Sequence, residues 1–139
     1  MKIRTIALPS DVGQEPFIEA LSFDSEVLTV RFDPDTGGQR FNISFTRPRG
    51  FRCLDEGDLL RYWEHDAIVG STLVEILDGG WLTDESHGHL DLSAHAQFRE
   101  FLIMDTDTCI TVLALSPPEI SIADGATKTV EPTGTSSSP

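Results

Sequence analysis

The chain has 139 residues, of which 23 are acidic and 10 basic, so its formal net charge at pH 7 is -13. The excess of acidic residues makes nucleic acid and anionic membranes unfavourable partners, because binding to phosphates depends on clusters of Lys and Arg. The negative charge can be explained by solubility alone. It would also attract a basic protein partner and speed association with it.

Length and composition predict one globular domain over residues 1–116, followed by a disordered tail over 117–139 that ends in TGTSSSP. Such a tail has too few apolar side chains to offset the entropy of ordering. No run of about 18 apolar residues occurs, which excludes a membrane-spanning helix on length. The first residues, MKIRTIALP, lack the apolar run of a signal peptide, so we expect a cytoplasmic protein.

Two hairpins are predicted. Residues 28–32 and 41–45 alternate apolar and polar side chains on either side of the turn sequence DPDTGG. The polar side chains of this hairpin should face water or a partner, and they are Thr29, Arg31, Asn42 and Ser44. A second pair of apolar stretches, 98–104 and 110–115, flanks the turn sequence DTDT.

Shorter elements complete the prediction. Residues 51–54 resume a strand, and a helix is expected from Asp55, which can cap its first turn, to about His65. Residues 71–77 predict a strand that ends at DGG, after which Trp81 and Leu82 begin a returning strand. The sum is an antiparallel α+β domain with six or seven short strands and one or two helices. A small β-barrel or sandwich is the alternative.

Both cysteines lie in apolar stretches, so Cys53 and Cys109 are expected to be buried, reduced thiols. A disulfide between them would require adjacent strands and a suitable Cα separation.

A polar loop at 84–95 contains three of the four histidines. Imidazole and carboxylate are ligands for zinc and similar divalent ions, and the candidate ligands are His87, His89, His95 and Asp91. The spacing matches no established zinc motif, so a solvated loop without a cofactor is the more common interpretation of such a composition.

Arginine and tryptophan supply the candidate binding residues. Arg47, Arg49 and Arg52 flank a turn, where their guanidinium groups could bind a carboxylate or phosphate or could pair with the chain's own acidic residues. Trp81, beside Gly79–Gly80, is a candidate binding anchor, although large aromatic side chains more often close a core.

No catalytic motif is found: the sequence contains neither GxSxG nor GxGxxG nor a phosphate loop, so an enzyme is not favoured. The segment GFRCLDEGDLLRYW, followed later by GGWL, resembles small uncharacterised bacterial proteins, some of them immunity-type. The resemblance implies a stand-alone cytoplasmic α+β protein that binds another protein.

The leading hypothesis is therefore a non-enzymatic protein-binding module with a basic partner. The rivals are a divalent-metal protein or metal-dependent enzyme that uses the His87–His95 loop, and a small-molecule binder. The sequence does not predict the oligomeric state.

Overall fold

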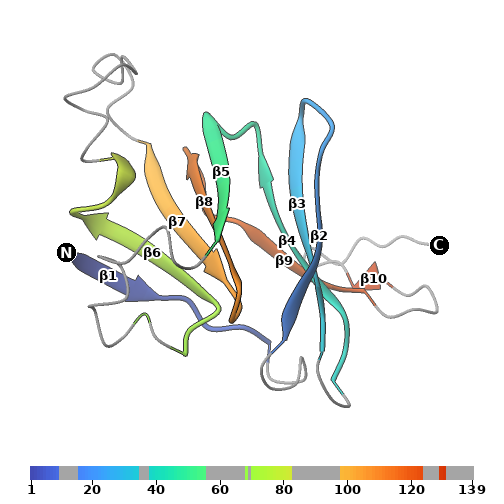
Figure 1. The fold of residues 1–139 in the computed structure, drawn as a ribbon. Coiled ribbons are helices and arrows are strands. Elements are labelled where there is room, and N and C mark those ends of the chain that lie inside the picture. Colours follow the sequence, from blue (N-terminus) through green and yellow to red (C-terminus); the bar gives the residue numbers. More distant parts are fainter. Residues whose placement is uncertain are drawn as a thin grey trace. The chain divides into compact units, whose positions relative to one another are not determined.

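A computed structural model describes residues 1–9, 16–34, 38–55, 68, 70–82, 98–123 and 129–130. They form ten strands in two five-stranded antiparallel sheets (Figure 1). The chain divides into two compact units, each built around one sheet. Unit 1 comprises Met1–Ala7 and Pro48–Pro117, and unit 2 comprises Leu8–Arg47 and Pro118–Pro139.

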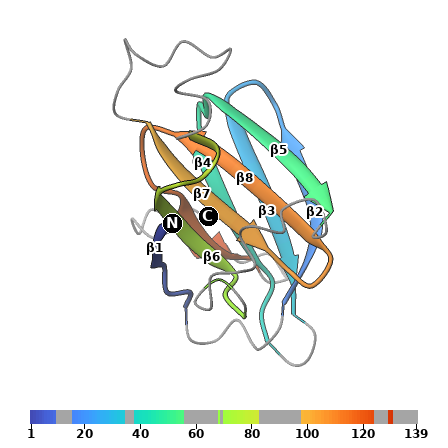
Figure 2. The same ribbon diagram turned by 60° about the vertical axis from the view of Figure 1, so that its left-hand side comes forward.

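The sheet of unit 1 has the strand order β1-β6-β7-β8-β5, with neighbouring strands side by side (Figures 1 and 2). In chain order its strands are β1 (Lys2–Thr5), β5 (Gly50–Asp55), β6 (Leu73–Asp78), β7 (Arg99–Met104) and β8 (Thr108–Ala114). The β7–β8 hairpin confirms the second predicted hairpin. Asp105 closes it, since its Oδ1 accepts hydrogen bonds from the amides of Asp107 and Thr108, both at 2.8 Å.

The two strands β7 and β8 are buried along nearly their whole length, on both faces. Strands covered on both sides lose the apolar–polar alternation of a half-exposed strand, which explains the unbroken apolar runs in their sequences. On one face of the sheet, six buried side chains form a cluster against which Ile3 and Leu54 pack. Its members are Ile68, Val74, Ile76, Leu102, Met104 and Cys109.

The sheet of unit 2 has the order β10-β9-β4-β3-β2. Its strands are β2 (Phe17–Phe23), β3 (Val27–Asp33), β4 (Phe41–Thr46), β9 (Glu119–Ala123) and β10 (Thr129–Val130). Register pairs Phe32 with Phe41, whose rings stack at a centroid distance of 4.7 Å. The β3–β4 hairpin is thereby confirmed.

The two faces of this hairpin differ as the alternation predicts. One carries six side chains that are fully or almost fully buried, namely Leu28, Val30, Phe32, Phe41, Ile43 and Phe45. The opposite face pairs Thr29 with Ser44 and Arg31 with Asn42, and all four are half-buried or exposed. Separating the apolar from the polar side chains in this way fixes the register, because a slip by one residue would expose the apolar row.

A tight turn joins β2 to β3. The Oδ1 atom of Asp24 accepts hydrogen bonds from the amides of Val27 at 2.8 Å and Glu26 at 2.9 Å. These bonds, that from Val27 first, lower the pKa of Asp24. Ser25, between Asp24 and Glu26 in the turn, has φ = 79°, in the left-handed region that favours glycine.

The predicted α+β class is wrong for the part of the chain that the structure describes. Ten strands replace the expected six or seven, and the helical residues there are confined to Trp81 and Leu82. Those two residues were expected to begin a strand, and that prediction is also wrong. The helix predicted from Asp55 to His65 falls outside the described residues beyond Asp55, which itself ends β5.

The boundary drawn at residue 116 also differs from the structure. Strand β9 begins three residues later and pairs with β4, so that Ile120 lies opposite Ile43 and Ile122 opposite Phe41. Residues 119–123 are therefore part of the sheet of unit 2 instead of the expected tail. None of the described residues belongs to a helix long and apolar enough to cross a membrane.

The two cysteines differ. Cys109 is buried, as expected, but Cys53 is exposed, because β5 lies at an edge of its sheet and turns Cys53 away from the buried cluster. The strands are adjacent, yet Cys53 is opposite Ile110 and Cys109 is opposite Leu54. The two thiols thus point to opposite faces, which excludes a disulfide in this register.

Candidate binding site

The structure brings together two of the predicted binding residues, Arg52 and Trp81, on one face of the unit 1 sheet. Arg49 lies one residue before β5, at the end of the sheet where β5 and β7 both begin. Arg47 belongs to unit 2.

The predicted metal ligands His87, His89, Asp91 and His95 lie outside the described residues. Among residues that are described, no group of three His, Cys, Asp or Glu side chains could hold a metal ion.

Trp81 is positioned by a buried carboxylate. Strand β6 ends at Asp78, and the turn Gly79–Gly80 leads into Trp81 and Leu82, whose backbone amides donate hydrogen bonds to Glu100 at 3.1 and 2.9 Å. Glu100 lies on β7 and is 1% exposed. Hydrogen bonds from two amides satisfy a carboxylate that would be costly to bury alone.

Gly80 makes this arrangement possible. A Cβ at this position would stand 2.6 Å from Oε1 of Glu100 and 2.8 Å from a methyl carbon of Ile76. Both distances are shorter than a van der Waals contact. Any side chain at residue 80 would therefore displace the carboxylate that holds Trp81.

Arg52 lies over the ring that Glu100 positions. Its guanidinium carbon is 4.4 Å from the Trp81 ring centroid, and its Nε donates a 3.0 Å hydrogen bond to the hydroxyl of Thr111. Thr111 is fully buried on β8 and is the register partner of Arg52 on β5, so both side chains share one face. We call Arg52, Thr111, Trp81 and Glu100 the Arg52 site.

Register explains why these four residues meet. Pairing across four strands aligns Val74, Leu102, Thr111 and Arg52 in one row of the sheet, and Ile76, Glu100, Leu113 and Gly50 in the next row on the same face. The Trp81 indole reaches the second row, since a Cβ built at Gly50 would lie 3.9 Å from its Cη2 atom. The polar site is thus continuous with the apolar cluster on this face.

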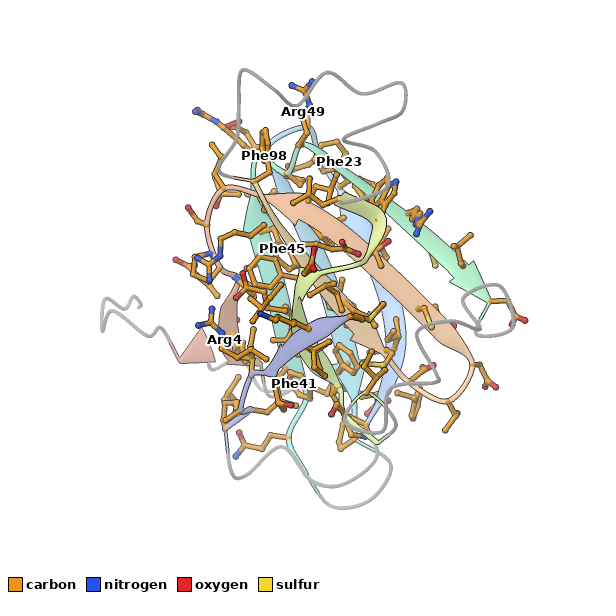
Figure 3. All side chains as sticks on the ribbon, turned by 90° about the vertical axis from the view of Figure 1, so that its left-hand side faces the viewer. Arg4, Phe23, Phe41, Phe45, Arg49 and Phe98 are labelled. Atoms are coloured by element: carbon orange, nitrogen blue, oxygen red, sulfur yellow. The ribbon has the colours of Figure 1, made fainter. Side chains whose placement is uncertain are left out.

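A second arginine stands over an aromatic ring nearby. The guanidinium of Arg49 is 5.8 Å from the ring centroid of Phe98, the residue that precedes β7 (Figure 3). A guanidinium near the face of an aromatic ring is attracted by the negative charge of that face. In the described part of the chain, neither Arg49 nor Arg52 has an ion pair with a carboxylate.

Arg47 behaves differently. Its Nε donates hydrogen bonds to both carboxylate oxygens of Glu26, at 3.0 and 3.2 Å, and both side chains are exposed. The bond to Glu26 raises the pKa of Arg47. In the same unit, Arg40 pairs with Asp33 at 3.5 Å. Arg47 is thus neutralised locally, as the alternative interpretation of the arginines expected.

Glu75 is a buried acidic residue that the sequence did not single out. Its carboxylate accepts hydrogen bonds from Arg99 at 2.7 and 3.0 Å and pairs also with Arg4. The bond from Arg99, followed by that from Arg4, lowers the pKa of Glu75 against the opposing effect of burial. Arg4, Glu75 and Arg99 lie on three adjacent strands, so this cluster ties β1 and β7 to β6.

The sequence signal for Glu75 and Glu100 was present. Glu75 lies between Val74 and Ile76 in LVEILD, a strand that also ends in Asp78, and Glu100 follows Arg99 and precedes the apolar run FLIM in REFLIM. A charge in that position is retained only when partners satisfy it, so it predicts a buried polar contact.

Comparison with known proteins gives no relative, since no family model, no curated protein and no solved structure matches the chain.

Proposed function

We propose that this chain is a non-enzymatic protein-binding module that contacts its partner through the Arg52 site. The observation that carries the proposal is the set of contacts that Arg52 makes. In a chain with 23 acidic residues, Arg52 is held against an aromatic ring and a hydroxyl, with no carboxylate partner among the residues described.

The side chains at this place are those that dominate protein interfaces. Tryptophan and arginine are enriched among residues whose truncation costs most binding energy, because they bury a large area and form directed hydrogen bonds. The Arg49–Phe98 pair extends the same chemistry along the end of the sheet. Arginine on an aromatic ring also loses less side-chain entropy on binding, since its position is already restricted.

The net charge supports a partner that is basic overall. A formal charge of -13 attracts a basic protein over a distance of about one Debye length, ~8 Å at physiological ionic strength. On this proposal the field brings the partner to the surface, and the Arg52 site provides contacts at short range.

The test is affinity capture from lysate with matched variants. Arg52→Ala and Arg47→Ala remove the same charge, but Arg47 is neutralised by Glu26 in unit 2. We expect a captured partner to be retained by wild type and Arg47→Ala and lost by Arg52→Ala and Trp81→Ala. Capture that all four proteins share equally would contradict the proposal.

A further inference from the structure

Arg52 is held in place by its neighbours in the unit 1 sheet. Three contacts hold it: Nε donates to Thr111 at 3.0 Å, the guanidinium carbon lies 4.4 Å from the Trp81 ring centroid, and the Trp81 amide donates to the buried Glu100. Thr111, which binds Arg52, and Glu100, which binds Trp81, are both at most 1% exposed, so both supporting groups are buried. A ligand that binds this guanidinium does not have to restrict the arginine first.

Most hydrogen-bond donors of Arg52 are available to a ligand. A guanidinium carries five N–H donors, of which the Nε–H is used by Thr111. The two terminal nitrogens of Arg52 therefore keep four N–H groups that have no acceptor within the described ranges. Glu100 lies on the same face, but its carboxylate is bound by the amides of Trp81 and Leu82.

The geometry of these donors selects the ligand. With Nε occupied, an incoming group meets the two terminal nitrogens end-on, as two parallel N–H donors in one plane. A carboxylate offers two acceptor oxygens at a matching separation. The indole beneath the guanidinium also provides an apolar face for the carbon atoms next to that carboxylate.

The charge of the chain decides between anions. A field of -13 opposes every approaching negative charge, so polyanions and phosphate groups are repelled more strongly than a single carboxylate. A carboxylate carried by a basic protein is opposed least, because the rest of the partner is attracted.

We infer that the Arg52 site binds one carboxylate of the protein partner, from an Asp or Glu side chain or from its C-terminus. This inference rests on the proposed function and deepens it. It assigns Trp81 and Thr111 the role of positioning residues, which orient the guanidinium without contacting the carboxylate.

The experiment is an NMR titration of the full chain with sodium acetate, with sodium chloride at equal ionic strength as the control. The signals are the Nε–H of Arg52 and the indole N–H of Trp81. We expect acetate to shift both in a saturable way that chloride does not reproduce. In Arg52→Lys, which keeps the charge and loses the fork, the indole response to acetate should weaken by at least about tenfold.

Four results would overturn the inference. They are no saturable response to acetate, an equal response to chloride, an unchanged indole response to acetate in Arg52→Lys, and a response to inorganic phosphate that saturates well below the acetate concentration. The last result would assign the site to phosphate instead of carboxylate.

The two proposals fail separately. If Arg52→Ala loses the captured partner but acetate has no specific effect, the binding function stands and the carboxylate inference is wrong. If acetate binds through Arg52 while capture is the same in wild type and Arg52→Ala, the proposed protein-binding function of this site is wrong.

Discussion

The two sheets differ in how they hold some of their arginines. In unit 2, Arg47 and Arg40 pair with carboxylates at the surface, and the buried face of β3 and β4 is entirely apolar. In unit 1, Arg4 and Arg99 also bind a carboxylate, that of Glu75, but Arg49 and Arg52 lie over aromatic rings instead. The sheet beneath them buries the polar side chains Glu75, Glu100 and Thr111.

This difference suggests that the apolar face of unit 2 contributes mainly to the stability of the fold, whereas the polar groups of unit 1 position a side chain for binding. A buried apolar face contributes to folding in proportion to the area it removes from water, whereas buried polar groups contribute less and mainly orient their neighbours. Unit 2 is therefore the simpler structural element, and unit 1 holds the groups that position the half-buried Arg52.

The largest expected effect is on the core of unit 2. Phe41→Ala removes a fully buried ring that stacks on Phe32, so the free energy of unfolding should fall by about 4 kcal/mol in urea denaturation. Thr29→Ala, on the polar face of the same sheet, should cost less than about 1 kcal/mol. Similar costs for both variants would show that the two faces are not distinguished as described.

Glu75→Gln tests the ionic cluster of unit 1. Loss of the charge weakens the bonds from Arg99 and Arg4, and the free energy of unfolding should fall by about 2 kcal/mol at pH 7. The cost is smaller than for a deeply buried pair because both arginines can reach water.

The same cluster predicts a pH dependence. The folded pKa of Glu75 lies below the ordinary value of 4.5, so its contribution is complete above that value and is lost as the pH falls toward the lowered pKa. Wild type and Glu75→Gln should therefore differ most at neutral pH and converge in acid. A constant difference from pH 7 down into the acid range would contradict the assignment.

Gly80→Ala tests the support of Trp81. The added Cβ collides with the Glu100 carboxylate, so we expect a loss of about 1–2 kcal/mol in unfolding free energy and a changed fluorescence of Trp81. Gly50→Ala is the matched control, because its Cβ would make an ordinary 3.9 Å contact with the same indole. Equal effects of the two substitutions would refute the role given to Glu100.

The smallest effect is expected at the turn of unit 2. Ser25→Gly removes the strain of a positive φ and should raise the unfolding free energy by about 0.5 kcal/mol. Ser22→Gly, inside β2, should lower it by about the same amount. A destabilised Ser25→Gly protein would argue against the left-handed conformation at this residue.

The two hairpins and strands β5 and β6 were predictable because their sequences carry local signals, whereas the sequence analysis did not predict β2 and β9. Strand β2 lies at an edge, most of its residues are exposed, and an irregularity between Ile18 and Ala20 breaks the alternation. Strand β9 has an alternating sequence, EISIA, but it follows Pro117–Pro118 and precedes a segment of disordered composition. Its pairing with β4 is a contact across about 75 residues of sequence, which local patterns do not encode.

The candidate site was predictable in its residue types and not in its geometry. Arg52 and Trp81 were chosen because such side chains bind partners, and they meet because antiparallel register brings β5, β7 and β8 together. Arg47 was chosen on the same grounds, but it lies in the other unit beside Glu26. Sequence proximity to Arg49 and Arg52 could not reveal that division of the chain.

The central claim, that Arg52 is positioned for binding and not for stability, is tested most directly by two measurements on Arg52→Lys. We predict a fall in unfolding free energy of no more than about 1 kcal/mol, which is the cost of the lost bond to Thr111, together with loss of the captured partner. A larger fall with partner capture retained would show that the arginine supports the fold, and would contradict the account.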